Sequence, residues 1–270
     1  MGMSIFAFDF SGSGLSGGKY VTLGCFEAED VRVVVRHLRE NEGITSVSLW
    51  GRSMGAVSSI LYSATDPQIQ ALVLDSPFTS LTEVSKDIIQ SYKYVPSAFV
   101  GPILQSLRKR VRKVAEFDIE EVAPIKVISK CKMPCVFIHS VEDTVVNLSH
   151  SVRLFDQYPN LTKIIIKIPG GHNTKRPRWL NEEAGVFVKN LVCPSNRGGH
   201  GNRTMFEHRV LDGPKSPMLP PVRVRSRNKS AFQVSLPPSP VPSSPGIAVV
   251  KSTKEMFSSS RRGSLLVPMI

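Results

Sequence analysis

Long hydrophobic runs are missing from this sequence. The apolar stretches, such as residues 164–166, are far shorter than the roughly 20 residues that a transmembrane helix needs. The N-terminus also lacks the basic start, apolar stretch and small-residue cleavage site of a secretory signal. These absences disfavour a membrane-spanning or secreted protein, and we expect a cytoplasmic location.

Cysteines are also scarce, with four in 270 residues, and a disulfide framework is not expected. Cys131 and Cys135 lie close together in the chain, but no other Cys or His accompanies them at zinc-finger spacing. We therefore expect reduced, partly buried thiols and no metal site.

Acidic residues are fewer than basic ones, with 22 Asp and Glu against 34 Lys and Arg. The excess lies mainly in residues 196–270, which hold 12 basic and 3 acidic residues, against 22 and 19 in residues 1–195. The same C-terminal segment holds 10 of the 20 prolines and few large apolar side chains. Such a composition cannot offset the entropy lost on ordering. We predict a folded domain over 1–195, with a boundary near 194–197, and a disordered, basic, Pro/Ser-rich tail over 196–270.

The basic tail suggests a partner of opposite charge. An acidic membrane surface fits this charge and would make the protein a peripheral membrane protein. Nucleic acid is disfavoured, because the tail offers only Phe206, Phe232 and Phe257 for stacking on bases.

The first 195 residues alternate short β-branched runs with helical patterns, which is typical of an α/β fold with a mostly parallel sheet and flanking helices. Apolar residues at helical spacing over 26–38 predict a crossover helix. A helical region over 104–114 carries five basic residues and is either a solvated helix face or a patch facing phosphate or membrane. The predicted strands are Ser4–Phe8, Ser46–Trp50, Ala71–Leu74, Cys135–His139 and Lys163–Ile168.

The strongest chemical signal is the segment WGRSMGA over residues 50–56, which fits the pattern G-x-S-x-G between a predicted strand and a predicted helix. In such a turn the serine is raised above the sheet edge, and the flanking glycines leave room for the turn. The pattern predicts Ser53 as a nucleophile and the backbone N–H of Met54 as an oxyanion donor. The alternative is an ordinary Gly/Ser loop.

A serine nucleophile needs a base, and His172 is the best candidate among the six histidines. It lies in a Gly-rich loop after the last predicted strand, where the loop can bring its imidazole over the sheet edge. The weaker candidates are His37 and His150 in helices, His139 at the end of a buried strand, and His200 and His208 in the tail.

The base in turn needs an orienting carboxylate. Asp143 follows the strand Cys135–His139 and gives the chain order Ser, Asp, His that this kind of site uses. Asp75, after the third strand, and Glu142 remain as alternatives.

Together these pieces resemble the α/β-hydrolase superfamily, in the branch of serine-aminopeptidase-like proteins and acyl-protein thioesterases. The resemblance implies that a helical cap over about 80–125 selects the substrate, and that Asp9, Gly12, Gly14 and Ser16 shape the edge of the site. The matching pieces, in chain order, are FDFSGSGLSG over 8–17, the turn at Ser53, DSPF over 75–78, the loop at Asp143 and GHN over 171–173.

One departure from this family concerns the start of the fold. Ser4–Phe8 resembles the fourth strand of the family fold, so the strands before it are expected to be missing. The missing part includes a central strand between Ser4–Phe8 and Ser46–Trp50 and a His-Gly segment that supplies a second oxyanion donor. Either the chain is a truncated product of a longer coding sequence or its sheet is rebuilt; we favour truncation.

The resemblance implies a serine hydrolase that needs no cofactor and cleaves a carboxylic ester, thioester or amide of a small-molecule or acyl-protein substrate. The alternative is a truncated, catalytically impaired hydrolase-like protein that acts through binding by its basic tail.

Overall fold

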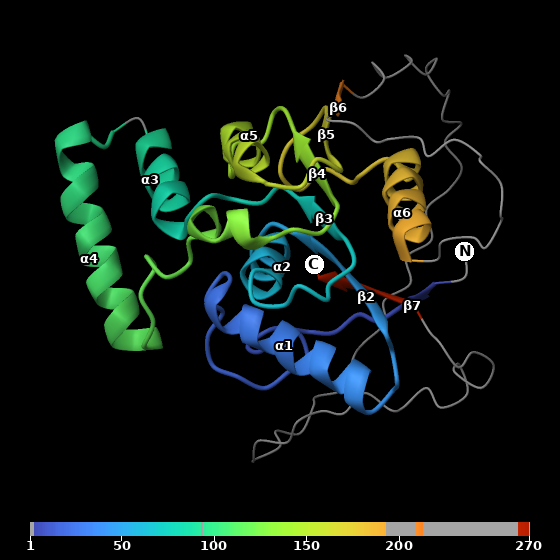
Figure 1. Cartoon of the computed structure of the whole chain (residues 1–270). Coiled ribbons are helices and arrows are strands. Elements are labelled where there is room, and N and C mark those ends of the chain that lie inside the picture. Colours follow the sequence, from blue (N-terminus) through green and yellow to red (C-terminus); the bar gives the residue numbers. More distant parts are fainter. Residues whose placement is uncertain (1–2, 93, 193–208, 213–263, 270) are drawn as a thin grey trace, which may run out of the picture.

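A computed structural model describes residues 3–92, 94–192, 209–212 and 264–269 (Figure 1). The elements are β1 (Ser4–Ile5), α1 (Cys25–Glu40), β2 (Ser46–Arg52), α2 (Met54–Ser63), β3 (Leu72–Asp75), α3 (Leu81–Ser91), α4 (Ser97–Ala115), the 3₁₀ turns η1 (Pro124–Lys126) and η2 (Ile128–Lys130), β4 (Cys135–Ser140), α5 (Leu148–Gln157), β5 (Lys163–Ile168), α6 (Arg178–Val192), β6 (Arg209–Asp212) and β7 (Ser264–Met269).

The described strands form one sheet in the order β1-β7-β2-β3-β4-β5-β6, and every neighbouring pair is parallel. The predicted α/β fold is confirmed. The strands β2 to β5 lie within two residues of their predicted bounds, whereas β1 ends at Ile5, three residues before the predicted end at Phe8. The predicted crossover helix is α1, and the region expected as a cap contains α3 and α4.

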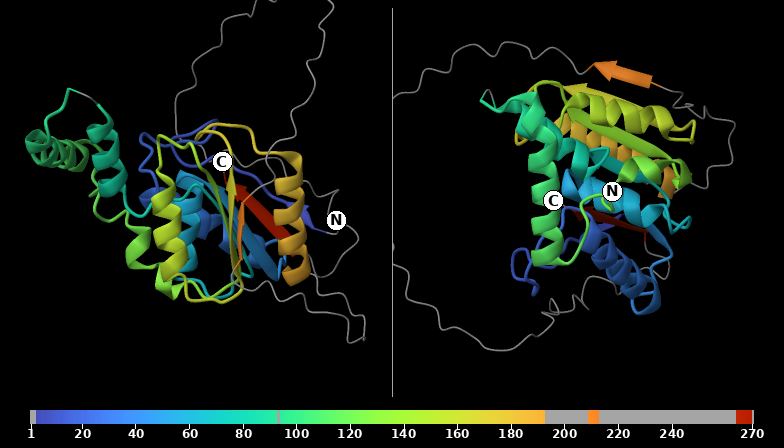
Figure 2. Two further views of the ribbon diagram at one scale, coloured as in Figure 1. Left: turned by 90° about the horizontal axis from the view of Figure 1, so that it is seen from above. Right: turned by 90° about the vertical axis from the view of Figure 1, so that its left-hand side faces the viewer.

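Helices cover both faces of the sheet, as the view from above shows (Figure 2, left). Successive side chains of a strand point to opposite faces, so each strand contributes to two cores. Leu72 and Leu74 of β3 pack in the core beneath α1, α2 and α5, which includes Leu154. Val73 between them belongs to the opposite core, which α6 closes with residues such as Phe187. The apolar runs of the central strands follow from this double burial.

The position between β1 and β2 is filled by β7, from the C-terminal end of the chain. Its register pairs Leu265 with both Ser4 and Val47, and Met269 with Gly51. The structure therefore differs from the expected gap at this central position. The backbone groups of β1 and β2 that face this position have hydrogen-bonding partners in β7, and the sheet is continuous.

The structure differs from the expected tail at two places. Residues 209–212 form β6 at the edge of the sheet next to β5, and residues 264–269 form β7. The rest of the tail predicted over 196–270 lies outside the described residues, and the boundary near 194–197 stays a prediction. Short apolar runs such as VL at 210–211 and LLV at 265–267 meet the needs of a strand, although the composition around them predicts disorder.

Removing residues 264–270 should expose the facing edges of β1 and β2, because their backbone groups lose partners. We expect stronger binding of a hydrophobic dye and a melting temperature lower by about 10 °C or more. Deleting residues 240–246, which lie outside the described sheet, is the control of equal length. An unchanged melting temperature without residues 264–270 would contradict the placement of β7.

Candidate active site

The turn between β2 and α2 holds Ser53 in a strained backbone conformation, with φ 49° and ψ −114°. Strain of this kind costs about 1–3 kcal/mol and persists only where the surroundings enforce it. Here the Ser53 N–H donates to the carbonyl of Asp75 over 2.7 Å. A Cβ at Gly51 would lie 2.2 Å from the carbonyl group of Gly55, so only glycine allows this close approach. The predicted strand-turn-helix geometry is present.

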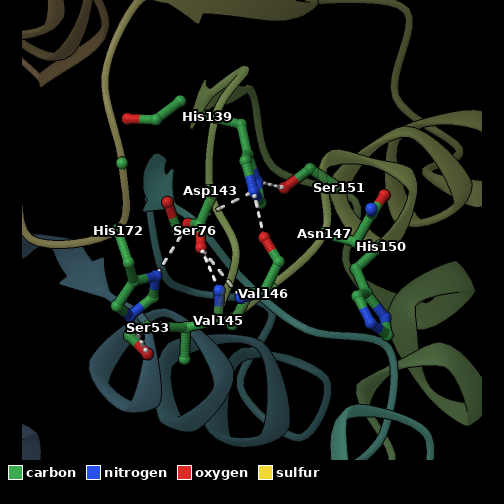
Figure 3. Close-up of polar contacts among 12 residues, drawn as sticks. Ser53, Ser76, His139, Asp143, Val145, Val146, Asn147, His150, Ser151 and His172 are labelled. Atoms are coloured by element: carbon green, nitrogen blue, oxygen red, sulfur yellow. Dashed lines mark hydrogen bonds and ion pairs between the residues drawn. The ribbon is translucent and has the colours of Figure 1, made fainter. Parts of the chain in front are cut away.

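The structure brings Ser53, His172 and Asp143 together at the carboxyl ends of the strands (Figure 3). His172 Nε2 lies 3.1 Å from Ser53 Oγ, and His172 Nδ1 lies 2.7 Å from Asp143 Oδ2. An ionised carboxylate only accepts hydrogen bonds, so Nδ1 carries the proton in the neutral imidazole. Nε2 is then free to accept the Ser53 hydroxyl proton.

The loop after β4 keeps Asp143 ionised. Its Oδ1 accepts hydrogen bonds from the backbone N–H groups of Val145 and Val146, at 2.9 Å and 2.8 Å. Burial raises the pKa of the Asp143 carboxyl, but the hydrogen bonds from His172 and from these N–H groups lower it by more than burial raises it. The pKa therefore lies below its usual value. The carboxylate therefore stays charged at neutral pH.

His139 supports the same loop from behind and is fully buried, as expected of a packed residue. Its Nε2 lies 2.9 Å from the Val146 carbonyl, which can only accept, and its Nδ1 lies 2.6 Å from the Ser151 hydroxyl. Burial lowers the pKa of His139, so the ring is neutral at physiological pH. The Val146 carbonyl needs a donor, so the proton of the neutral ring is on Nε2. The Nε2–H group of His139 donates to Val146 and holds the loop that contains Asp143 (Figure 3).

The first turn of α2 lies beside Ser53. Met54 is the first residue of the helix, and its N–H has no intrahelical acceptor. The positive end of the helix dipole adds to this N–H, so a developing negative charge next to Ser53 is stabilised there. The geometry agrees with the oxyanion role predicted for Met54.

Asp75, the leading alternative for the acid, has a different partner. It is buried and forms a double hydrogen bond with Arg176, from Nε to Oδ2 at 2.8 Å and from Nη2 to Oδ1 at 2.7 Å. Arg176 Nη1 also donates to the Ser140 hydroxyl, at 2.5 Å, and to the Thr174 carbonyl, at 3.2 Å. One guanidinium thus joins the ends of β3 and β4 to the loop that carries His172.

Arg52 holds the same loop from the other side. Its Nη2 donates to the carbonyl of His172 and, at 3.4 Å, to that of Thr174. Gly170 permits the loop its turn, with φ 102°, and a Cβ there would lie 2.8 Å from the Thr174 side chain. Sequence reasoning missed Arg52 and Arg176, although Arg52 stands inside the G-x-S-x-G pattern.

The remaining alternatives do not join this group. Glu142 is exposed, and its backbone N–H donates to the Gly170 carbonyl over 3.2 Å. His37 is exposed on α1, and His150 is buried between Thr79 and Asp87. Within the described residues, no hydrogen bond joins His172 to a second carboxylate. His200 and His208 lie outside the described residues.

The loop that opens with Asp9 is held by hydrogen bonds between its own residues, as expected of a structural segment. Asp9 Oδ2 accepts the Leu15 N–H over 3.0 Å, and the Ser16 hydroxyl donates to the Asp9 carbonyl over 2.7 Å. A Cβ at Gly14 would lie 2.2 Å from the Asp9 carboxylate. Gly12 likewise has a positive φ, at 78°.

Comparison with known proteins finds a family and several relatives. The family model described as serine aminopeptidase, S33, matches residues 1–126. The uncharacterized protein YqkD of Bacillus subtilis is 27% identical over 197 residues, which cover 71% of this chain and 64% of that protein. Protein ABHD12B of Homo sapiens is 27% identical over 201 residues, covering 72% of this chain and 49% of that protein. The chain therefore spans about half to two thirds of the length of these relatives.

A solved structure has the same fold. The esterase Pf2001 of Pyrococcus furiosus matches with a TM-score of 0.53 and 23% identity, over 68% of this chain and 69% of that chain. The family model, these relatives and the fold support the α/β-hydrolase superfamily for this chain. In this structure the turn at Ser53 and the loops of Asp143 and His172 all lie at the carboxyl ends of parallel strands, where open α/β sheets carry their sites.

The contributions of Asp75 and Arg176 to the free energy of unfolding should be strongly coupled. Arg176→Gln leaves the buried carboxylate of Asp75 with only the longer ion pair to Arg52 Nε, at 3.8 Å, and should lower the free energy of unfolding by about 3 kcal/mol. Adding Asp75→Asn removes that charge, so the double variant should lose less than the sum of the single losses. Urea denaturation of Arg176→Gln, Asp75→Asn and the double variant measures the three free energies of unfolding.

The control is Arg178→Gln. Arg178 pairs with Glu182 on the exposed surface, so this substitution should lower the free energy of unfolding only slightly. Strictly additive losses at Asp75 and Arg176 would contradict the coupling.

Proposed function

We propose that this α/β-hydrolase is a serine hydrolase that cleaves a carboxylic ester, thioester or amide through an acyl-enzyme. The observation that carries the proposal is the continuous chain of hydrogen-bonding groups from Ser53 through His172 to Asp143, at 3.1 Å and 2.7 Å. A serine hydroxyl is a weak nucleophile unless a base of this kind removes its proton.

In the first half of the reaction, Ser53 Oγ attacks the acyl carbon while its proton passes to His172 Nε2. The imidazolium that forms is stabilised by Asp143, which also keeps the ring in its reactive orientation. The C–O, C–S or C–N bond to the leaving group then breaks, and Nε2 returns the proton to that group. In the second half, water replaces the leaving group and the same proton path releases the carboxylic acid.

The negative charge of the tetrahedral intermediate needs a donor beside Ser53. The Met54 N–H at the start of α2 is suited to this role, because it follows the nucleophile and lies at the positive end of the helix dipole. The neighbouring contacts of Arg52 and Arg176 would position His172 without touching the substrate.

Ser53→Ala should abolish hydrolysis of a small activated ester, with kcat/KM falling by about 10³-fold or more. Removing the nucleophile leaves only the contributions of binding and of the oxyanion donor. Ser149→Ala, at an exposed serine of α5, is the matched control and should keep full activity. Full activity of the Ser53→Ala variant would show that Ser53 is not the nucleophile.

Asp143→Asn should lower kcat by about 10⁴-fold while the fold persists. The N–H groups of Val145 and Val146 hold the acceptor oxygen in place, so the new NH₂ group would face His172 Nδ1. Nδ1 would then have to accept, Nε2 would carry the proton, and the base would be lost. Asp75→Asn should reduce kcat far less, and the reverse ranking would assign the acid to Asp75.

A further inference from the structure

The helices α3 and α4 stand apart from the two layers that cover the sheet (Figure 1, left side; Figure 2, left panel). Both lie between β3 and β4, and α3 starts at the sheet edge that carries Ser53, Asp143 and His172. The inner face of α4 contains Val100, which is 4% exposed. Val111 and Ala115, on the same stripe, pack against the cluster that includes Phe117 and Val122, whereas the flank of α4 beside this stripe is only partly covered.

That flank of α4 carries a row of exposed apolar side chains. Phe99, Ile103 and Leu107 follow at four-residue steps, and Val114, seven residues on, continues the row. They are 58%, 38%, 38% and 42% exposed. Tyr94, just before the helix, is 97% exposed. Single exposed apolar residues are ordinary, but a row along one helix marks an interaction surface.

Cations accompany this row, and α4 contains no acidic residue. Lys109 and Lys113, also four residues apart, form a second exposed row, and Arg110 is exposed between them. The other two basic residues, Arg108 and Arg112, pair with Asp118. No ion pair among the described residues involves Lys109, Arg110 or Lys113, so three positive charges face solvent beside the apolar row.

We propose that α4 docks this protein on an anionic lipid surface. An amphipathic helix with aromatic and aliphatic residues on one side and Lys and Arg beside them lies in the plane of the membrane interface. Phe99, Ile103, Leu107 and Val114 enter the boundary of headgroups and acyl chains, and the cations bind lipid phosphates. None of the described helices is long and apolar enough to cross a bilayer, and α4 lies on the surface.

Charge favours an anionic lipid surface over two other partners, the chain's own C-terminal segment and a second copy of the chain. The chain's own segment 196–270 carries 12 basic and 3 acidic residues, so it repels the cations of α4. A second copy that paired through α4 would bring Lys109, Arg110 and Lys113 against the same residues. A surface of negative charge with an apolar interior satisfies both rows at once. Docking there also brings the edge of the sheet that carries Ser53 close to lipid.

The experiment measures co-sedimentation of the full chain with phosphatidylcholine vesicles, with and without about 30% phosphatidylserine. We expect binding that requires the anionic lipid and weakens with salt. Phe99→Ser with Ile103→Ser should reduce the partition coefficient by about tenfold or more, since two apolar side chains no longer insert. Lys109→Gln, Arg110→Gln and Lys113→Gln together should reduce it by about a hundredfold.

Matched controls separate α4 from total charge and from the basic C-terminal segment. Val33→Ser with Val186→Ser removes equally exposed apolar residues from α1 and α6. Lys130→Gln, Lys132→Gln and Lys189→Gln together remove the same charge from other exposed positions. Both controls should bind within about twofold of the unchanged chain. Equal losses in the α4 variants and their controls, or no loss in either, would overturn the proposal.

A second readout reports on insertion directly. In Phe99→Trp, the added fluorescence over the native Trp50 and Trp179 should shift to shorter wavelength when anionic vesicles are added. A new tryptophan that remains in water while the protein is bound to the vesicles would show that another surface makes the contact, such as the basic segment 196–270. That outcome also contradicts the proposal.

Discussion

The edge of the sheet that carries the candidate site depends on one buried ion pair, between Asp75 and Arg176. Asp75 ends β3, and its carbonyl also accepts the N–H of Ser53, so the same residue contacts the strained turn and the loop of His172. A buried guanidinium needs all its donors satisfied, and here carboxylate, hydroxyl and carbonyl oxygens satisfy them. Ser53 and His172 come from distant parts of the chain, and this pair holds the turn of Ser53 and the loop of His172 at the same edge of the sheet.

Local signals were sufficient for much of the fold and for the three residues of the candidate site. The turn at Ser53 is encoded within seven residues, because Gly51 and Gly55 must approach within van der Waals distance. His172 and Asp143 follow directly after buried strands, and parallel strands bring such loops to the same edge. The choice of Asp143 over Asp75 could be argued only from chain order until the partner of Asp75 was known.

Two features escaped prediction because their causes are not local. Arg176 stands in the basic segment KRPR over 175–178, which predicts a solvated loop, and its partner lies 101 residues earlier. The strand β7 is six residues within a long segment whose average composition predicts disorder. What makes it a strand is the open position between β1 and β2, and nothing in its neighbourhood along the chain encodes that position. The helical spacing over 104–114 predicts an apolar side on α4, but only the fold shows that Val100 on this side is buried while Phe99 beside it is more than half exposed.

The account depends most on Ser53 being a nucleophile activated by His172. A fluorophosphonate phosphonylates such serines and forms a stable adduct in place of the acyl-enzyme. Intact-mass measurement followed by peptide mapping should find one adduct per chain, located at Ser53, and the adduct should form far more slowly after His172→Ala. An adduct at another residue, or labelling of Ser53 at an unchanged rate without His172, would contradict the account.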